Sequence, residues 1–200
     1  MIRLPRRAAC GAAALGLALG LALGLATSPA QAEDDLKTRA SEAEQAVAAG
    51  KTLDALELAD RFSQAVWNAA PLAFRKTGLV DAEPTAFGQD TPRADNVYGV
   101  DEEIHIYAEP VAFGWSPSGD GFETDMVADV RVSDTDGKII AGHKAFSEFK
   151  IASSDRDADI FLALTYVFGG LGSGDYVVTT TLHDRIGDKT AAFSVPITIR

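Results

Sequence analysis

The sequence predicts a mainly β protein, an antiparallel β-sandwich of about seven strands preceded by an α-helical hairpin. Two patterns carry this prediction. Residues 97–200 alternate apolar and polar side chains in short runs separated by turn residues, with no helical pattern between them. Residues 33–71 are instead rich in Ala, Leu, Glu, Lys and Gln, which are good helix formers.

Residues 1–32 carry the three parts of a secretory signal peptide. Three arginines lie among the first seven residues, an apolar run follows over residues 8–26, and Ala30 and Ala32 form a small-residue cleavage site. We therefore expect cleavage before Glu33 and a periplasmic or secreted protein. A retained membrane anchor is the alternative, because the apolar run is about as long as the shortest spanning helices, which need roughly 17–25 residues.

Cleavage changes the chemistry of the chain. It removes Cys10, the only cysteine, so the mature protein has no disulfide, no thiol chemistry and no cysteine for a lipid. It also removes three of the 18 basic residues and none of the 29 acidic ones, which takes the net charge from −11 to about −14. This charge repels phosphate backbones and anionic lipids, so we expect no nucleic acid partner. Membrane contact is expected only through the signal peptide before cleavage.

The helical segment divides into two helices at Gly50, which suits the position just after a helix. Thr52 is expected to cap the second helix and Pro71 to end it. Apolar residues recur at helical spacing along the second helix, with Phe62 close by: Leu53, Leu56, Ala59, Val66 and Ala70. A single helical pair cannot bury its own apolar face, so we expect the pair to dock on another surface.

Residues 72–96 separate the helices from the strands. Gly78, Pro84, Gly88 and Pro92 punctuate this segment, which predicts a linker or a segment that wraps a neighbouring surface. Its apolar residues are numerous enough to lie on such a surface.

Alternation defines the strands from residue 97 onward. In the first run the apolar residues are expected to face inward: Ile104, Ile106 and Ala108. The residues between them are expected to face outward: His105, Tyr107 and Glu109. The longest run, residues 122–132, sends Met126 and Val130 one way and Asp125 and Asp129 the other. Residues 175–183 and 191–199 alternate in the same manner, and this spacing favours a sandwich of the immunoglobulin-like type.

Turns and loops divide the remaining strands. Asp136-Gly137 favours the positive backbone angles of a tight hairpin turn, and we expect two short strands after it, over residues 138–142 and 145–151. Residues 160–168 are apolar throughout and predict a central strand. The glycine-rich residues 169–174 predict a flexible hairpin loop.

The closing stretch carries a recognisable succession of residues: Gly174-Asp175-Tyr176, then a turn with Asp184, Gly187 and Lys189, then a final apolar strand to Arg200. This succession resembles the last hairpin of immunoglobulin-like modules in exported bacterial proteins. The resemblance covers about 27 residues closely and residues 97–200 loosely. It implies a fold and a compartment, and no activity, because such sandwiches host many functions.

Acidic residues suggest two candidate metal sites. Asp155, Asp157 and Asp159 place three carboxylates in one loop, which suits calcium, although crowded aspartates also serve as turn formers. The outward-facing His105 and His183, with carboxylates beside them, could hold a transition metal, but their spacing is not that of a known metal motif. A solvated acidic face is the alternative.

Motifs for catalysis are missing from the sequence. The loop at residues 169–174 lacks the Lys-Ser/Thr ending of a phosphate cradle, and a strand rather than a helix follows it. Neither Gly-x-Ser-x-Gly nor His-Glu-x-x-His occurs. We therefore expect no enzymatic activity and no cofactor.

Two aromatic residues, Phe113 and Trp115, precede a Pro-Ser-Gly-Asp-Gly loop. Exposed aromatic rings near a loop can stack on a sugar or a peptide, whereas packing at the rim of the core is the alternative. If Trp115 is exposed, it marks the first place to look for a ligand.

Together these observations predict a non-catalytic periplasmic module with a binding or structural role. Its expected partner is another periplasmic protein or a cell-wall component. The alternative is a metal-handling protein that uses the acidic sandwich face or the loop at residues 155–159.

Overall fold

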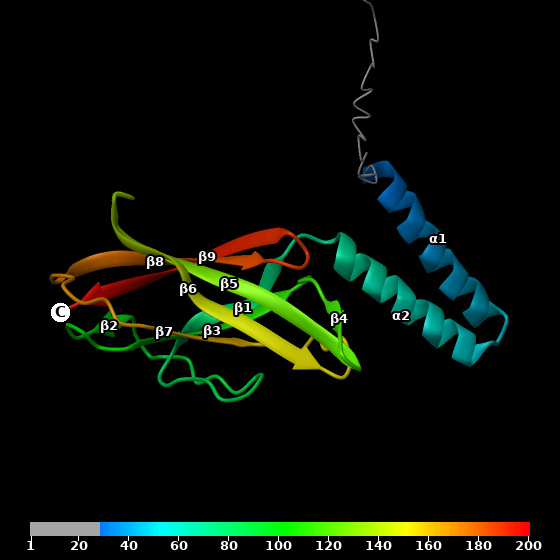
Figure 1. The fold of residues 1–200 in the computed structure, drawn as a ribbon, viewed down its shortest axis with the longest axis horizontal. Helices are drawn as coiled ribbons and strands as arrows, with labels where there is room; N and C mark the ends of the chain where they lie inside the picture. Colours follow the sequence, from blue (N-terminus) through cyan, green and yellow to red (C-terminus); the bar gives the residue numbers. More distant parts are fainter. Residues whose placement is uncertain (1–28) are drawn as a thin grey trace, which may run out of the picture.

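The computed structural model describes residues 29–200, with side chains from residue 35 onward. Within this range two helices lead into nine strands (Figure 1). The helices are α1 (Pro29–Ala48) and α2 (Thr52–Ala69). The strands are β1 (Ala73–Val80), β2 (Val97–Tyr98), β3 (Ile104–Val111), β4 (Ser116–Ser118), β5 (Gly121–Asp134), β6 (Ile139–Ser153), β7 (Leu162–Tyr166), β8 (Gly174–Asp184) and β9 (Lys189–Ile199).

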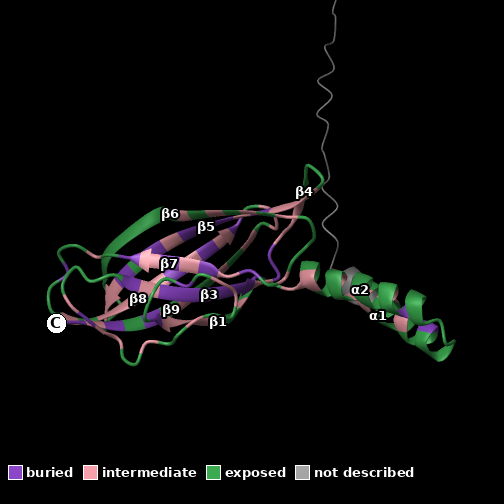
Figure 2. Ribbon diagram, turned by 90° about the horizontal axis from the view of Figure 1, so that it is seen from below, coloured by how far each residue is buried: buried purple, intermediate pink, exposed green. Residues whose placement is uncertain are grey.

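Two sheets pack face to face around one core. The smaller sheet has the order β1-β3-β7, and the larger has the order β2-β9-β8-β5-β4, with β6 paired to the other edge of β5. All pairings are antiparallel except that of the two-residue β2 with β9. Figure 2 shows the buried residues concentrated on the facing strands of the two sheets. Side chains at the centre of the core are Ile104, Ile106, Met126, Leu162, Leu164, Tyr166, Val178, Leu182 and Ile197.

This architecture confirms the predicted fold class, a mainly β sandwich preceded by a helical hairpin. The alternation in β5, β8 and β9 has the predicted direction, since Met126 and Val130 in β5, Val178 in β8 and Ile197 in β9 are buried. The described chain contains more strands than the seven or so predicted, because β1 lies in the predicted linker and β2 and β4 are very short.

The segment predicted as a linker, residues 72–96, contains a full strand, so this part of the prediction was wrong. β1 pairs with β3 throughout, with a bulge between Phe74 and Lys76. Arg75 and Lys76 interrupt the apolar alternation at that bulge, which hid the strand in the sequence. The remainder of the segment wraps β3 as predicted: the Gly88 N–H donates to the Tyr107 hydroxyl (2.8 Å).

This wrapping segment buries the outward face of β3. Tyr107 and Glu109, predicted to face solvent, are both buried. The Tyr107 hydroxyl donates to the Glu109 carboxylate (2.7 Å), and burial raises the pKa of Tyr107 to about 12. Lys76 and Asp90 form an ion pair beside them (2.6 Å between Nζ and Oδ2).

β5 and β6 form one long hairpin. The predicted Asp-Gly turn is confirmed, with Gly137 at φ 83° and the Asp134 carboxylate accepting the N–H of Lys138 (2.8 Å). The two short strands predicted after this turn are one strand, β6. A bulge interrupts β6 at Ala145 (φ 50°), whose N–H donates to Asp129 Oδ1 (2.8 Å).

The apolar sequence of residues 160–168 predicted a central strand. β7 instead lies at an edge of the smaller sheet. Leu162, Leu164 and Tyr166 face the core, and the apolar residues on either side of the strand obscured this alternation. The glycine-rich residues 169–174 join β7 to β8 in the other sheet. They are therefore a crossing between sheets and not a hairpin loop.

The helical hairpin extends away from one end of the sandwich, and its connecting turn at Gly50 is the part farthest from the sheets (Figures 1 and 2). It covers neither sheet, and the expectation that the pair docks on another surface stays a prediction. The residues buried between the two helices include Ala46 and Ala55, whereas the predicted stripe is largely exposed: Leu53 is 81% exposed and Leu56 60%. Small residues allow the two helices to approach closely, and the larger ones lie outside the contact.

The ends of α2 differ in how well the sequence predicted them. Lys51 and not Thr52 precedes the helix, and no side chain caps its first turn. Pro71 ends the helix as predicted, because it holds Ala70 in an extended conformation.

Residues 1–28 of the predicted signal peptide lie outside the described residues, and its predicted cleavage point falls within α1. No helix in the described part of the chain is both long and apolar enough to cross a bilayer.

Candidate functional site

The last turns of α2 meet the sandwich at the end of β3, and a small set of polar contacts forms this joint. Trp67 Nε1 donates to the carbonyl of Phe113 (2.7 Å), and the two rings pack edge to face at 5.1 Å. Lys189 Nζ donates to the carbonyl of Ala112 (2.7 Å) and lies 3.4 Å from that of Trp67. Burial lowers the pKa of Lys189, and Asp184 partly offsets that effect.

Asp184 fixes the loop that carries Phe113 and Trp115. Its carboxylate is 2% exposed and accepts the N–H groups of Gly114 (2.6 Å) and Gly187 (3.0 Å). The two glycines touch: a Cβ on Gly114 would lie 2.4 Å from the Gly187 nitrogen. The β3–β4 loop is therefore clamped to the β8–β9 turn.

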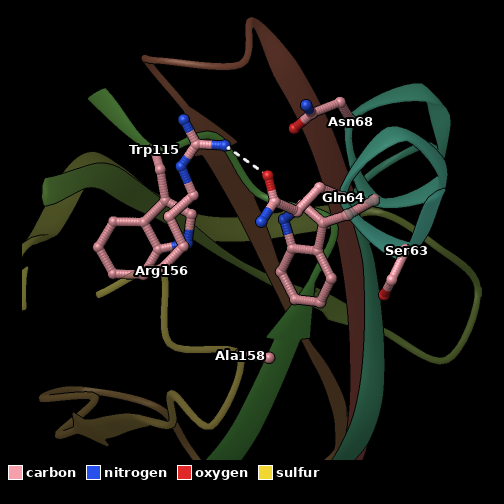
Figure 3. Close-up of a pocket in the computed structure, with 7 residues that line it drawn as sticks. Ser63, Gln64, Asn68, Trp115, Arg156 and Ala158 are labelled. Atoms are coloured by element: carbon pink, nitrogen blue, oxygen red, sulfur yellow. Dashed lines mark hydrogen bonds between the residues drawn. The ribbon is translucent and has the colours of Figure 1, made fainter. Parts of the chain in front are cut away.

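A pocket of about 180 Å³ opens beside this joint (Figure 3). Three segments contribute its walls, namely the last two turns of α2, the β3–β4 loop and the β6–β7 loop. The lining residues are Ser63, Gln64, Trp67, Asn68, Trp115, Arg156 and Ala158. The pocket combines two indole rings with amide, hydroxyl and guanidinium groups, and no carboxylate or imidazole lines it.

Arg156 bridges the mouth of this pocket. Its Nη1 donates to Gln64 Oε1 (3.3 Å), as the dashed line in Figure 3 marks, and its guanidinium lies 4.8 Å from the ring centre of Phe122. Asp155 and Asp157 flank Arg156 in the chain, and its side-chain hydrogen bond within residues 35–200 is to the neutral amide of Gln64.

Trp115 separates this pocket from a second hollow of about 210 Å³. Its ring is half-buried and packs on Phe113 with 5.5 Å between ring centres. The second hollow is lined by Trp115, Ile151, Ala152, Ser153, Asp157, Asp159, Ile160 and Phe161. Trp115 is thus the one side chain common to the two hollows' linings.

The structure separates the two aromatic residues predicted to contact a ligand. Trp115 lines the pocket, and its contact with a ligand stays a prediction. Phe113 is 0% exposed, belongs to the core and lines neither hollow, so its predicted ligand contact was wrong. Ala112, with a positive φ of 62°, interrupts the alternation of β3, so Phe113 faces inward although the even-numbered residues of the strand do so before it.

The three aspartates predicted to bind calcium lie in the exposed β6–β7 loop. Asp157 Oδ1 accepts the N–H of Asp159 (2.8 Å), Asp155 Oδ2 accepts the hydroxyl of Ser154 (3.2 Å), and Asp159 lies 3.8 Å from Arg75. Among the residues the structure describes, no group of three or more His, Cys, Asp or Glu side chains could share a metal ion. Calcium binding by this loop stays a prediction.

The histidines also lie apart from one another. His105 contacts Thr165 (3.0 Å) on the smaller sheet, whereas His183 contacts Asp129 (3.1 Å) and Thr190 (3.3 Å) on the larger one. The N–H of Ala145, followed by His183, lowers the pKa of Asp129. These contacts satisfy each ring within its own sheet.

Sequence reasoning missed the contribution of α2 to the site. Trp67, Gln64 and Asn68 lie on the helical hairpin, which the sequence assigned to a separate unit. The available signal was a tryptophan and two amides in the last turns of an otherwise Ala-rich helix, just before Pro71.

Comparison with known proteins assigns this chain to no family. No family model matches the chain, and no curated protein matches it. The chain is similar to Spo0M, a sporulation control protein from Bacillus subtilis, at 12% identity and a TM-score of 0.34. That alignment covers 66% of this chain and half (50%) of Spo0M.

The chain is also similar to the CARDB domain of the PF1109 protein from Pyrococcus furiosus. A solution NMR structure of that domain gives 14% identity and a TM-score of 0.28, covering 62% of this chain and 93% of the domain. A crystal structure of the same domain in complex with di-metal ions gives 14% and 0.27, covering 63% and 94%. These values correspond to a coarse likeness between β-sandwiches.

Proposed function

We propose that this protein is an exported, non-catalytic binding module whose ligand occupies the pocket at the joint between α2 and the sandwich. The observation that carries the proposal is the convergence of Trp67, Trp115 and Arg156 from three separate segments on one small pocket. A few well-placed polar groups among aromatic walls are the usual composition of ligand sites.

The chemistry of the lining supports binding and not catalysis. General acid–base catalysis needs a group that exchanges a proton near neutral pH, most often a histidine or a carboxylate. The pocket's polar side chains are instead those of Ser63, Gln64, Asn68 and Arg156. None of these is paired with a base among the contacts of the described residues.

The size of the pocket supports a ligand that is part of something larger. Its volume of about 180 Å³ is below the roughly 300–1,000 Å³ of sites that enclose a drug-sized molecule. One ring or one side chain of a longer chain fits this space. A cell-wall component or another exported protein therefore remains the class of partner.

The binding proposal is tested with the full mature chain and a soluble extract of the cell envelope. We expect the extract to quench and shift tryptophan fluorescence saturably and to raise the melting temperature, because a ligand that binds only the folded state stabilises it. Trp115→Ala should abolish both effects, whereas Trp115→Phe should retain the thermal shift. An equal response from Trp115→Ala and wild type would contradict the proposed site.

Export is tested separately, because it rests on residues 1–32 alone. Fused to a phosphatase that is active only outside the cytoplasm, these residues should confer activity. Replacing the three arginines by glutamate should reduce it, since a positive start is part of the signal. A fusion protein that is inactive and stays in the cytoplasmic fraction would refute export.

A further inference from the structure

We infer that the joint pocket takes one neutral sugar ring of a glycan. This inference rests on the proposed binding function and deepens it by naming the ligand class. It follows from three properties of the lining: flat aromatic walls, polar groups that both donate and accept, and the charge around the pocket.

The aromatic walls suit a ring with an apolar face. Trp67 and Trp115 line the same pocket, and neither ring is fully buried. Trp67 is oriented by its N–H bond to Phe113, and Trp115 by packing on the same residue. An indole presents a large, rigid apolar face. The C–H face of a pyranose ring has the matching shape and polarity.

The polar groups suit hydroxyls. Each sugar hydroxyl donates one hydrogen bond and accepts others, so a site for it needs donors and acceptors together. The amides of Gln64 and Asn68 and the hydroxyl of Ser63 supply both kinds. Arg156 adds N–H donors beyond the one it gives to Gln64.

The charge of the protein selects a neutral ligand. The net charge, −11 for the full sequence and about −14 after the predicted cleavage, repels anionic polymers such as polyuronates, and one arginine flanked by Asp155 and Asp157 does not reverse that field. No carboxylate lines the pocket to attract a cation. A neutral sugar ring is not repelled by the acidic protein and needs no carboxylate in the pocket.

A proline-rich peptide is the competing macromolecule, because it also stacks on tryptophan. Such peptides lie as extended helices, rising about 3.1 Å per residue, along an aromatic-lined groove. Here the two indoles close a single compact pocket of about 180 Å³, and the second hollow beyond Trp115 carries Asp157 and Asp159. The geometry favours one ring over an extended segment.

The test uses the full mature chain and titration calorimetry, with tryptophan fluorescence as a second readout. The probes are hexasaccharides of cellulose, chitin, mannan and starch, a hexagalacturonate, and a proline-rich decapeptide. We expect at least one neutral hexasaccharide to bind saturably and the hexagalacturonate not to bind. Trp115→Ala should weaken that binding by roughly 30-fold, the loss typical of a central aromatic contact.

Two variants distinguish a local effect on sugar binding in the pocket from a general effect on the stability of the protein. Asn68→Ala should weaken sugar binding, whereas Arg131→Ala, a change to an exposed arginine on the outer face of β5, should leave it unchanged. Both should keep the wild-type melting temperature.

The other outcomes distinguish this inference from the proposed function. Binding of the peptide with the same Trp115→Ala sensitivity, and no binding of neutral sugars, would overturn the sugar class and keep the binding function. Binding of the hexagalacturonate alone would overturn the neutral class. No saturable response to any probe or to the envelope extract would overturn both.

Discussion

The carboxylate of Asp184 accepts a hydrogen bond of 2.6 Å from the N–H of Gly114, a residue 70 positions earlier in the chain. This bond ties the turn between the last two strands to the loop that carries Trp115. The last two strands and their turn thus supply two residues to the joint, Asp184 and Lys189. The sequence placed both residues in the turn of the last hairpin, and the structure shows that they also hold the joint beside the candidate site.

Removing the Asp184 carboxylate should loosen the joint. In Asp184→Ala the N–H groups of Gly114, Ile186 and Gly187 lose their acceptor. We expect the free energy of unfolding to fall by about 2–4 kcal/mol, because unsatisfied buried donors are costly. Urea denaturation measures this change, and Asp136→Ala, in an exposed turn, should change it by less than about 0.5 kcal/mol. Equal effects of the two variants would contradict the clamp.

Close packing at Gly114 gives a second prediction. A methyl group there would lie 2.4 Å from the Gly187 nitrogen, so Gly114→Ala should destabilise the protein by about 1–3 kcal/mol and shift tryptophan emission. Gly172→Ala is the matched control, because nothing lies within 4 Å of its Cβ position. The melting temperatures of the two variants should differ clearly. Identical melting temperatures would show that the loop moves to accommodate the methyl group, which would contradict the prediction.

The pH dependence of Asp129 gives a third prediction. Its pKa is lowered in the folded protein, mainly by the N–H of Ala145 and then by His183. The resulting stability is therefore present above the unfolded pKa of about 4 and is lost as the pH falls through the folded value. Urea titrations should show wild type more stable than Asp129→Asn at pH 6, with the difference shrinking toward pH 2.5. A constant difference at both pH values would contradict this assignment.

Three tyrosines have a raised pKa, mainly through burial, and for two of them the value is about 12. Burial raises the pKa of Tyr166 to about 12, with the Thr180 hydroxyl opposing it, and burial raises that of Tyr107 to about 12 as well. Because the folded pKa values exceed the unfolded value of about 10, this stability is complete below pH 10 and is lost as the pH approaches 12. Absorbance at 295 nm should show late phases, and Tyr166→Phe and Tyr107→Phe should each remove one tyrosine from them. Full ionisation of wild type by pH 11 would contradict both.

The joint lysine gives a fifth prediction. Lys189→Met removes the donor to the carbonyls of Ala112 and Trp67 while keeping much of the side chain's length. We expect faster proteolysis near residue 70 with little change in the core, because the hairpin is held at few points. Lys138→Met, at the exposed β5–β6 turn, should leave the cleavage rate unchanged. Mass spectrometry of the fragments identifies the site.

Sequence reasoning succeeded where the pattern is local. The alternation in β5 and β8 requires only neighbouring residues, and Met126 and Val178 have the predicted burial. It failed where another element decides the environment. Tyr107 is buried because residues 81–96 cover it, and Leu53 is exposed because small alanines form the contact between the helices.

In the candidate site, too, local signals were recognised in the sequence, whereas contacts between distant segments were not. Trp115 was singled out in the sequence because an aromatic residue beside a polar loop is a local signal. Trp67 and Gln64 were missed because they lie on a helix, and only the fold brings them to Arg156, 92 residues from Gln64. Phe113 was misassigned because alternation could not be followed through Ala112, which has a positive φ of 62°.

The projecting hairpin converts small angles into large displacements. α2 has 18 residues and is therefore about 27 Å long, and only its final turns contact the sandwich. A rotation of about 10° at the joint moves the Gly50 turn by about 5 Å, a simple lever ratio on that length. The pocket lies at the joint about which the hairpin would rotate. Fluorescent labels on the turn and on the sandwich would therefore report any stiffening or tilting at Trp67 in amplified form.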